Sequence, residues 1–444
     1  MTLDTERVDC VVVGAGLAGM SAAHRLATAG LSVVVAEASD RTGGRAATTW
    51  VDGAPVDRGF QSLFAAYPET RDFLRAIGMG REDFAPFSRG GVFHDGDTWS
   101  RLAMSPGGLW HFSGLRRGDI ARLGRLVAEV AARSPAALLA GQEKTMTTAE
   151  YLSRRGFSAT AVDGFFRPLF GVITLDRGLG ADAAYFRFLL SMLARGPAVA
   201  PVDGHGMITE RATEDLRRRG GEVRTGSRVA AVLTDESGAR ATGVRLVGGG
   251  EIVARSVVLA VAAPAAIELL RPLDPDAAAH VPTAPAGSAT LAYLLDRPLY
   301  RGRTIVLNSA PDGGGPRIDL VCQATNTIRP EGGVPHVLLA MSITTGIDDE
   351  PDADALAAAT EALVERWVPG FDLGRNGRLV EVILHPFAQF RVTPGVRTRL
   401  PGARTRVAGL VVAGDLTAHP SIEGAVSSGR VAAEVVAEQL TVTP

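Results

Sequence analysis

The chain has 444 residues, of which 46% are hydrophobic and 21% are charged, and its formal net charge at pH 7 is −2. This length supports two or three packed domains, and the near-neutral charge excludes binding to nucleic acid through an overall positive field. Two cysteines, Cys10 and Cys322, are too few for a disulfide framework, and no metal site is predicted. With a polar, acidic N-terminus and no apolar run near the ~20 residues that span a bilayer, the sequence predicts a cytoplasmic protein.

The first elements in chain order form a βαβ unit. A continuous apolar run at 9–13 predicts a strand buried on both faces. Residues 17–29 then predict a helix that ends at Gly30, and 31–36 predict a second buried strand. A strand, a helix and a strand within about 30 residues are typical of a nucleotide-binding unit.

The turn between this strand and helix carries the pattern Gly14-x-Gly16-x-x-Gly19. These glycines permit a tight turn, close approach of the backbone to a pyrophosphate, and close helix–strand packing. The free N–H groups at the helix start attract phosphate. Glu37, at the end of the second strand, can accept hydrogen bonds from a ribose, and its charge disfavours NADP. The pattern therefore predicts a dinucleotide site.

Residues 40–61 favour a flavin dinucleotide over NAD. Gly43-Gly44-Arg45 offers backbone N–H groups and a fixed cation beside the pyrophosphate, and a guanidinium matches phosphate geometry. Taken alone, Arg45 would be interpreted as a solvated surface arginine. Its place beside two glycines, shortly after a ribose-binding acid, favours the phosphate role.

The middle of the chain predicts helices and a second sheet. Residues 63–200 contain helical stretches rich in arginine and alanine, 207–219 predict a helix, and 284–393 contain alternating stretches typical of strands. The stretch 107–127 mixes Trp110 with leucines and arginines. It either rests on a membrane surface or forms a solvated amphipathic helix, and the second interpretation is favoured.

The last fifty residues return to the pattern of the first. The run 409–415 predicts a strand that ends in Gly414-Asp415, and a helix begins near Gly424-Ala425. Asp415 can accept a hydrogen bond from a ribityl hydroxyl, and the positive end of the helix can stabilise negative charge on a reduced flavin. The alternative is an ordinary strand–turn–helix in which Asp415 is a cap.

Three stretches occur in the order and spacing of a known signature: "VVVGAGLAGMSAAHRLATAG", "EASDRTGGRAAT" and "AGDLTAHPSIEGAVSSG". Together they resemble the flavin amine oxidase and phytoene desaturase superfamily. "DRGFQSLFAAYPE" and "FFRPLFGVITLD" look closer to its phytoene desaturase-like members. The resemblance implies an α/β (α+β overall) fold with two domains. A Rossmann-like FAD-binding domain would comprise 1–75, 203–283 and 394–444. A substrate-binding domain of mixed sheet and helices would comprise 76–202 and 284–393.

The resemblance also implies which residues hold FAD. No cysteine lies near the C-terminal motif, so we expect noncovalent binding. A backbone group at Val229 would face the adenine. The implied cofactor residues are Gly14, Ala15, Gly16, Leu17, Ala18, Gly19, Glu37, Ala38, Gly43, Gly44, Arg45, Gly59, Phe60, Gln61, Val229, Gly414, Asp415, Ser421, Ile422 and Ala425.

A flavin can accept a hydride without a further acid, base or nucleophile, so the sequence assigns no catalytic residue. Phe387 and Gln389 are candidates to face the site, and His419 is either an acid–base group or a turn residue. His205 is interpreted as a loop residue at a helix start. Six aromatic residues are candidates to line a pocket: Phe165, Phe166, Phe170, Tyr185, Phe186 and Phe188. For each of them taken singly, a place in the hydrophobic core is the favoured interpretation.

The leading hypothesis is an FAD-dependent dehydrogenase or desaturase that takes a hydride from an apolar or amphiphilic small molecule, such as an isoprenoid, onto flavin N5. An amine or amino-acid oxidase is disfavoured. Lys144, the single lysine, lies outside the flavin motifs, and Ser421 stands where the resemblance implies a cage aromatic. A redox-neutral flavin isomerase and a non-catalytic flavin-binding scaffold stay open. The expected partner is a hydrophobic small molecule, not nucleic acid, with peripheral membrane contact left open. The substrate, electron acceptor and oligomeric state are not assigned.

Overall fold

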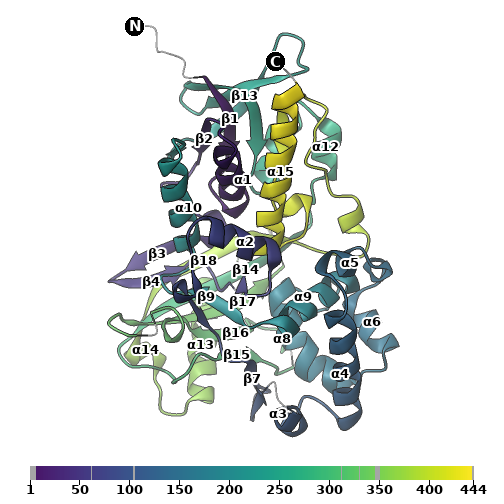
Figure 1. Ribbon diagram of the computed structural model, residues 1–444. Helices are drawn as coiled ribbons and strands as arrows, with labels where there is room; N and C mark the ends of the chain where they lie inside the picture. The colour runs from purple at the N-terminus through teal and green to yellow at the C-terminus, as the bar shows by residue number, and fades with distance from the viewer. Residues whose placement is uncertain are drawn as a thin grey trace.

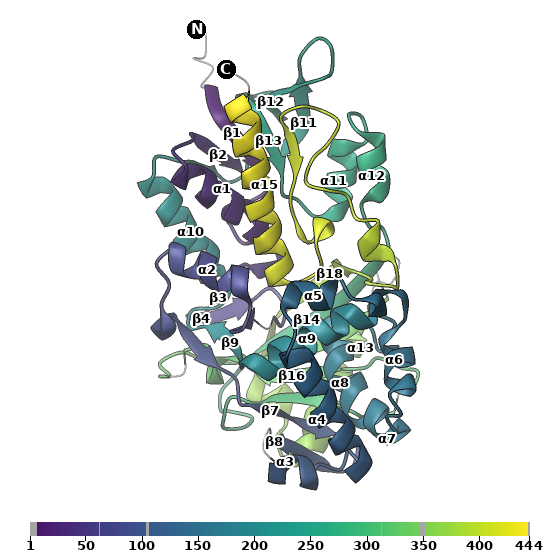
Figure 2. The same cartoon turned by 45° about the vertical axis from the view of Figure 1, so that its right-hand side comes forward.

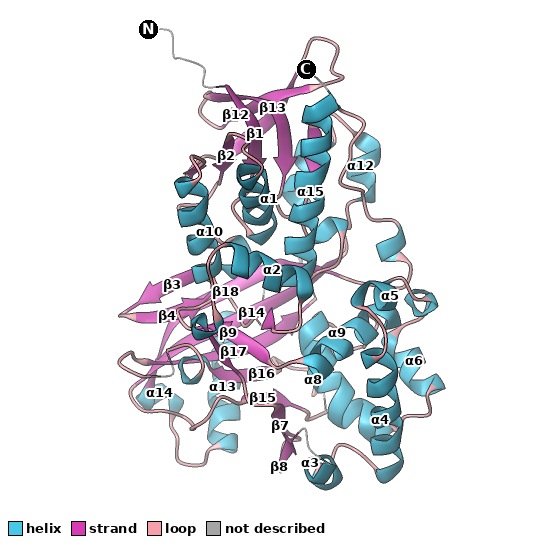
Figure 3. Ribbon diagram, viewed as in Figure 1, coloured by secondary structure: helices cyan, strands magenta, loops and turns pink. Residues whose placement is uncertain are grey.

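The computed structural model describes residues 7–61, 63–103, 106–311, 313–329, 331–345 and 351–442. Two seven-stranded sheets lie one below the other in the orientation of Figure 1, and the first and last described elements, β1 and α15, both belong to the upper layer. Helices cover the upper sheet, and a separate group of helices packs beside the lower sheet (Figure 3).

The upper sheet has the order β10-β2-β1-β13-β12-β11, with β19 pairing to β13 as well. Five strands run parallel: β1 (Arg7–Val13), β2 (Val33–Ala36), β10 (Glu222–Arg224), β13 (Glu251–Leu259) and β19 (Leu410–Val412). Antiparallel β11 (Val229–Thr234) and β12 (Ala241–Leu246) complete one edge. Its strands thus come from the beginning, middle and end of the chain.

Helices cover both faces of this sheet, which explains why its strands are continuous apolar runs. Cys10 and Val12 pack into one core with the first face's helices, and Val11 and Val13 pack into a second core on the other face. The first face carries α1 (Leu17–Thr28), α10 (Gly206–Arg218) and α15 (Ile422–Val442), and the second carries α11 (Ala263–Leu270) and α12 (Pro275–His280).

The lower sheet has the order β18-β14-β17-β16-β15-β7-β8 and is antiparallel except where β15 pairs with β7. Its strands are β7 (Gly90–His94), β8 (Trp99–Ala103), β14 (Pro285–Leu295), β15 (Ile305–Asn308), β16 (Leu320–Gln323), β17 (His336–Thr344) and β18 (Gly377–Phe390). One face packs against α13 (Ala353–Trp367) and α14 (Leu373–Asn376). The other face packs into the core that also contains α1 and α15.

Smaller elements connect these layers. They are the hairpin β3 (Thr48–Val51) and β4 (Ala54–Asp57), the three-stranded sheet of β5 (Leu63–Phe64), β9 (Ala198–Pro201) and β6 (Phe84–Pro86), and the helix α2 (Pro68–Ala76). The helices beside the lower sheet are α3 (Pro106–His111), α4 (Arg117–Ala131), α5 (Pro135–Leu139), α6 (Thr148–Arg154), α7 (Ala159–Ala161), α8 (Arg167–Thr174) and α9 (Ala183–Arg195).

The helices α3 to α9, which we call the helical group, bury many of their apolar side chains in the hydrophobic core. The six aromatic residues between 165 and 188 named above are all buried. Helix α4 buries Leu123, Leu126 and Val130, while Trp110 is 54% exposed, with the Arg117 guanidinium 4.7 Å from its ring centre. The stretch 107–127 thus contains an amphipathic helix whose apolar face is already covered. Among the described residues, no helix has the length and hydropathy to cross a membrane.

Helices α1 and α15 lie side by side although they stand at opposite ends of the chain (Figure 2). The approach requires glycine, because a Cβ at Gly429 would collide with the Ala18 carbonyl oxygen. The Ser21 hydroxyl donates a hydrogen bond to the Val426 carbonyl oxygen at 2.9 Å. The last helix is therefore fixed directly against the helix that follows the glycine turn.

Gly19→Ala tests the closeness of packing at the first turn of α1. A Cβ at Gly19 would collide with the Gly14 carbonyl oxygen. We expect this variant to lose about 3 kcal/mol of unfolding free energy, measured by urea denaturation, because backbone must move. The matched control is Gly124→Ala on the exposed side of α4, where a Cβ meets nothing within 4 Å. Helix propensity predicts that this control gains up to about 1 kcal/mol. Equal effects of the two changes would contradict the packing argument.

Candidate functional site

The glycine turn ends β1 and begins α1, and the start of this helix borders open space at Gly16. Gly14 has φ of 101°, which favours glycine, and its N–H donates to the Ala36 carbonyl oxygen at 2.8 Å. Gly16 is the N-cap of α1 and offers no side-chain cap, and a Cβ there would meet nothing within 4 Å. The first turn of α1 also contains no acidic residue. This helix start is therefore suited to an anion.

Glu37 lies beside the same turn. Its Oε2 accepts a hydrogen bond from the Ala15 N–H at 2.7 Å, and its Oε1 accepts from the Ser39 N–H at 2.8 Å. Oε1 also accepts from the Ser39 hydroxyl at 2.7 Å, so the lone pair that remains for a hydroxyl donor lies on Oε2. The Glu37 carbonyl oxygen accepts from the Ser227 N–H at 2.7 Å, which brings the start of β11, and so Val229, to this end of the sheet. The exposed Ala38 follows directly.

The Gly43–Arg45 segment folds over the turn. The Gly43 N–H donates to the Ala15 carbonyl oxygen at 2.9 Å, and Gly44 lies against Gly16. Arg45 Nη1 then donates to Asp415 Oδ2 at 2.9 Å and to the Ala388 carbonyl oxygen at 2.6 Å. The charge of Asp415 raises the pKa of Arg45, so this guanidinium is a fixed cation. One side chain thus joins the first glycine motif, the last glycine motif and the lower sheet.

Asp415 and the start of α15 are held as one unit. Asp415 is 7% exposed, and the preceding Gly414 N–H donates to Ser428 Oγ within α15 at 2.8 Å. Ser421 caps the helix, since its Oγ accepts from the Gly424 N–H at 2.9 Å and its carbonyl oxygen accepts from the Ala425 N–H at 2.9 Å. Ile422 is the half-buried first residue of the helix. The turn that carries Asp415 therefore fixes the position and direction of the α15 N-terminus, which is the positive end of the helix dipole.

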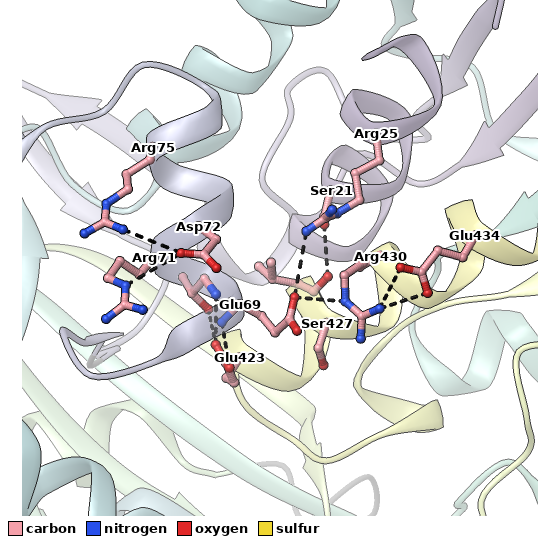
Figure 4. Close-up of polar contacts among 12 residues, drawn as sticks. Ser21, Arg25, Glu69, Arg71, Asp72, Arg75, Glu423, Ser427, Arg430 and Glu434 are labelled. Carbon is pink, nitrogen blue, oxygen red and sulfur yellow. Dashed lines mark hydrogen bonds and ion pairs between the residues drawn. The ribbon is translucent and has the colours of Figure 1, made fainter. Parts of the chain in front are cut away.

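Glu423 fixes this helix start from the other side, a contact that the sequence analysis missed. Its carboxylate accepts hydrogen bonds from the Glu69 N–H at 3.0 Å and the Thr70 N–H at 2.9 Å, the first donors of α2 (Figure 4). Arg430 of α15 donates to Glu69 Oε2 at 2.9 Å. Burial raises the pKa of Glu423. An acid in the first turn of α15 was visible in the sequence, but its partner 353 residues away was not.

His419 is a buried turn residue. Its Nδ1 lies 2.9 Å from Ser421 Oγ, and its ring centre lies 4.9 Å from that of Phe188. Burial lowers the pKa of His419 to about 3, so the ring is neutral near neutral pH. The geometry favours the turn role over the acid–base role, both of which the sequence had left open.

Phe387 and Gln389 lie near the end of β18, where the two layers meet. Phe387 packs against the cores on both faces of the upper sheet. Gln389 Nε2 donates to the Ile173 carbonyl oxygen at 3.1 Å, whereas its buried Oε1 has no partner among the described residues. The buried Thr290 Oγ1, also without such a partner, lies 3.7 Å from where a Cβ at Gly59 would be. Two orphaned polar atoms at this junction fit a flat polar ring between the layers.

The segment Gly59–Gln61 borders a cavity of about 10 Å³ at this junction, room for about one water molecule. We call it the junction cavity. Phe60 and Phe87 form part of its lining, with ring centres 6.0 Å apart, and Cys322 and Leu339 line the side of the lower sheet. The Gln61 side chain donates to the Arg45 carbonyl oxygen, which fixes the segment Gly59–Gln61 to the segment Gly43–Arg45.

A buried Asp57–His205 pair also lines the junction cavity. Asp57 Oδ2 lies 2.7 Å from His205 Nδ1, and Oδ1 accepts from the His205 N–H at 2.8 Å. His205 is 1% exposed, and its Nε2 has no partner among the described residues. His205 lies at a helix start, as the sequence predicted, because it is the N-cap of α10. Its hydrogen-bond partner Asp57 was not predicted, since it lies 148 residues earlier. Lys144, by contrast, lies in a half-buried 3₁₀ turn (Gln142–Thr145) within the helical group.

The site combines a glycine turn at a helix start with an acid at the end of the next strand, and Arg45 joins both to a second strand–turn–helix. This combination is that of a flavin-dependent oxidoreductase. The chain belongs to the flavin containing amine oxidoreductase family, whose features it matches over residues 17–437. FAD is the cofactor, and the open space at Gly16 together with the orphaned atoms of Thr290 and Gln389 fits such a group.

Full-length relatives support this assignment. The chain is 28% identical over 457 residues to hydroxysqualene dehydroxylase of Rhodopseudomonas palustris, covering 96% of this chain and 97% of that protein. It is 22% identical over 464 residues to 15-cis-phytoene desaturase of Arabidopsis thaliana, covering 96% and 80%. A 27% match to the same desaturase of an Oncidium hybrid covers 51% of this chain and only 41% of that protein. An oxidoreductase structure from Methanosarcina mazei shares the fold, with a TM-score of 0.72, 17% identity and coverage of 98% and 100%.

Arg45→Ala tests the link between the two glycine motifs. We expect FAD affinity to fall about 10- to 100-fold, because a charged hydrogen-bonding group contributes roughly 1.5–3 kcal/mol. Bound flavin per polypeptide and a fluorescence titration with FAD measure the change. Arg41→Ala is the matched control, since Arg41 is exposed and pairs with its neighbour Asp40. Unchanged FAD affinity in Arg45→Ala would contradict the role.

His419 predicts a pH dependence of stability. Its folded pKa lies below its unfolded value of 6.5, so the unfolded state binds more protons and stability falls as pH drops below 6.5 toward 3. One such group contributes a slope of at most about 1.4 kcal/mol per pH unit. We expect His419→Asn to show a shallower loss than the wild type in thermal denaturation between pH 6.5 and about 4. The exposed His280→Asn should leave the slope unchanged, and identical slopes in all three proteins would refute the assignment.

Proposed function

We propose that this protein is an FAD-dependent dehydrogenase or desaturase that takes a hydride from a C–H bond of an apolar, isoprenoid-type molecule. The observation that carries the proposal is the composition of the junction cavity. Its lining includes the apolar residues Phe60, Phe87, Ala324, Ile328 and Leu339, and neither lysine nor arginine is among its lining residues. Removal of an apolar chain from water into such a lining is favourable, whereas an ammonium substrate would lose its hydration with no compensating charge other than Asp57, which is already hydrogen-bonded to His205.

The names of two relatives agree with such a substrate. Phytoene and hydroxysqualene are hydrophobic molecules, and the relatives named for them match nearly the whole of this chain. Putrescine oxidase of Kocuria rosea is 36% identical, but over only 30% of the chain. The single lysine, Lys144, stands in the helical group rather than in the junction cavity. These points favour a hydrocarbon substrate over an amine.

The chain's own residues would bind and orient the reactants. In this proposal the FAD domain consists of 1–75, 203–283 and 394–444 and the substrate domain of 76–202 and 284–393, with FAD bound noncovalently. Bound FAD supplies a ring that accepts the hydride at N5. The first turn of α1 and Arg45 would hold the diphosphate, Glu37 and Asp415 would accept hydrogen bonds from hydroxyls, and the α15 N-terminus would stabilise developing negative charge.

Substrate entry requires a change at the junction cavity, which is too small for a hydrocarbon chain as it stands. Phe60 and Phe87 pack edge to face across it, at an interplanar angle of 62°. Phenyl rings form no conventional hydrogen bonds, so we infer that movement of this pair is the change that opens the cavity. The proposal therefore places the entry of the substrate at this aromatic pair.

Anaerobic flavin bleaching tests the proposed reaction. The FAD-loaded protein would be mixed in detergent with phytoene, hydroxysqualene, squalene or putrescine, and the absorbance of the oxidised flavin would be followed. We expect bleaching by a polyisoprenoid and a product two hydrogens lighter by mass spectrometry. Bleaching by putrescine alone would overturn the proposal in favour of an amine oxidase. Conversion only by pre-reduced protein, with no change in product mass, would replace it with the isomerase alternative.

A further inference from the structure

A second hollow lies on the far face of the lower sheet from the junction cavity. It has a volume of about 320 Å³, within the size range of sites for small molecules. Its lining comes from β7, β8, β15, the end of α13 and the loop before β15. We call it the outer cleft, and its principal lining residues are Trp99, Arg101, Tyr300, Arg301, Val306 and Trp367.

Strand register explains why these side chains share one face. Val92 pairs with Arg101 across β7 and β8, and with Val306 across β7 and β15, so the three stand in one row. Trp99 is two residues from Arg101 and therefore points to the same side. Val306 belongs to the core beneath α13, whereas Cys322 and Leu339 of the junction cavity belong to the core on the other face. The sheet therefore separates the outer cleft from the junction cavity.

Aromatic rings form an apolar wall of the outer cleft. Trp99 is 47% exposed, and its ring centre lies 5.5 Å from that of Trp367. Trp367 is 4% exposed, and its Nε1 has no hydrogen-bond partner among the described residues. The Tyr300 hydroxyl is satisfied, because it donates to the Thr304 carbonyl oxygen at 2.6 Å and accepts from the Gln323 N–H at 2.8 Å. The exposed ring of Trp99, supported by the buried ring of Trp367, therefore forms a surface on which a flat apolar group can pack.

The charge of the outer cleft is positive. Arg101 and Arg301 line it, and no aspartate or glutamate does. Within the part of the chain that the structure describes, neither guanidinium forms an ion pair. Other arginines do form ion pairs: Arg177 with Asp319 at 2.6 Å, and Arg397 with Asp182 at 2.7 Å. Two unpaired guanidiniums beside exposed aromatic surface form a site for an anion that carries an apolar body.

We propose that the outer cleft binds a small organic anion, with a flat apolar body against Trp99 and a carboxylate, sulfonate or phosphate group on Arg101 and Arg301. This ligand is distinct from the substrate at the junction cavity, because a sheet lies between the two places. The proposal does not depend on the reaction proposed above.

Dye binding to the FAD-loaded full chain tests the outer cleft. The probe is 8-anilinonaphthalene-1-sulfonate, an aromatic anion whose fluorescence rises in apolar surroundings, and its neutral counterpart is N-phenyl-1-naphthylamine. We expect saturable binding of the anion that weakens with added salt, as screening requires. The double variant Arg101→Ala/Arg301→Ala should bind the anion about tenfold more weakly, a change of about 1.4 kcal/mol, while the neutral dye is little affected. Trp99→Ala should weaken binding of both dyes.

Matched controls separate the outer cleft from other dye sites. Arg125→Ala and Trp110→Ala remove an exposed arginine and an exposed tryptophan outside the outer cleft, and both should leave the binding of the anion unchanged. Thermal denaturation and flavin content of each variant report its folding, and Arg101→Gln/Arg301→Gln, which removes both charges but keeps polar side chains, serves if the alanine pair fails to fold. Unchanged affinity in both the arginine and Trp99 variants would overturn the proposal. Displacement of the anion by a molecule that bleaches the flavin would also overturn it, by placing the dye at the junction cavity.

Discussion

The ion pair between Arg45 and Asp415 is the contact on which the rest of the site depends. Its partners are 370 residues apart in sequence and join the loop over the glycine turn to the turn before α15. Arg45 also reaches the Ala388 carbonyl oxygen on the lower sheet, so the pair stands where the two layers and both chain ends meet. Because Asp415 is nearly buried, its charge requires this cation, and the cation in turn fixes the distance between the two glycine motifs.

A second set of contacts fixes the direction of α15 once its start is in place. Glu423 caps α2, Arg430 reaches Glu69 of that helix, and Ser21 of α1 bonds to the α15 backbone (Figure 4). Glu423, Val426 and Arg430 are spaced i, i+3 and i+7, so these contacts fix one face of α15 against α1 and α2. An electrostatic role for the helix start needs such rigidity, since a dipole stabilises charge only when its direction is preset.

The sequence predicted best what depends on neighbours along the chain. The strand at 9–13 and the helix at 17–29 are observed as β1 (Arg7–Val13) and α1 (Leu17–Thr28), because apolar runs and glycines mark such elements locally. The flavin family was likewise evident from motifs at both chain ends. The Asp57–His205 pair and the cap that Glu423 gives α2 were not predictable, since a buried acid finds its partner through the tertiary fold. The aromatic residues near 170 could be pocket or core, and only their burial decides this.

The position of β19 and α15 has a consequence for synthesis of the chain. These elements come from the last forty or so residues, yet β19 pairs with β13 in the upper sheet and α15 covers α1. Before they are added, residues 257–259 of β13 lack their partner strand β19, and the side of α1 that α15 covers is exposed. Domains fold as units during translation, but this one cannot close until α15 has left the exit tunnel. A flavin site that needs both Arg45 and Asp415 is therefore incomplete before residue 415 is added, and chains that stop before residue 410 would expose the edge of β13 that β19 covers.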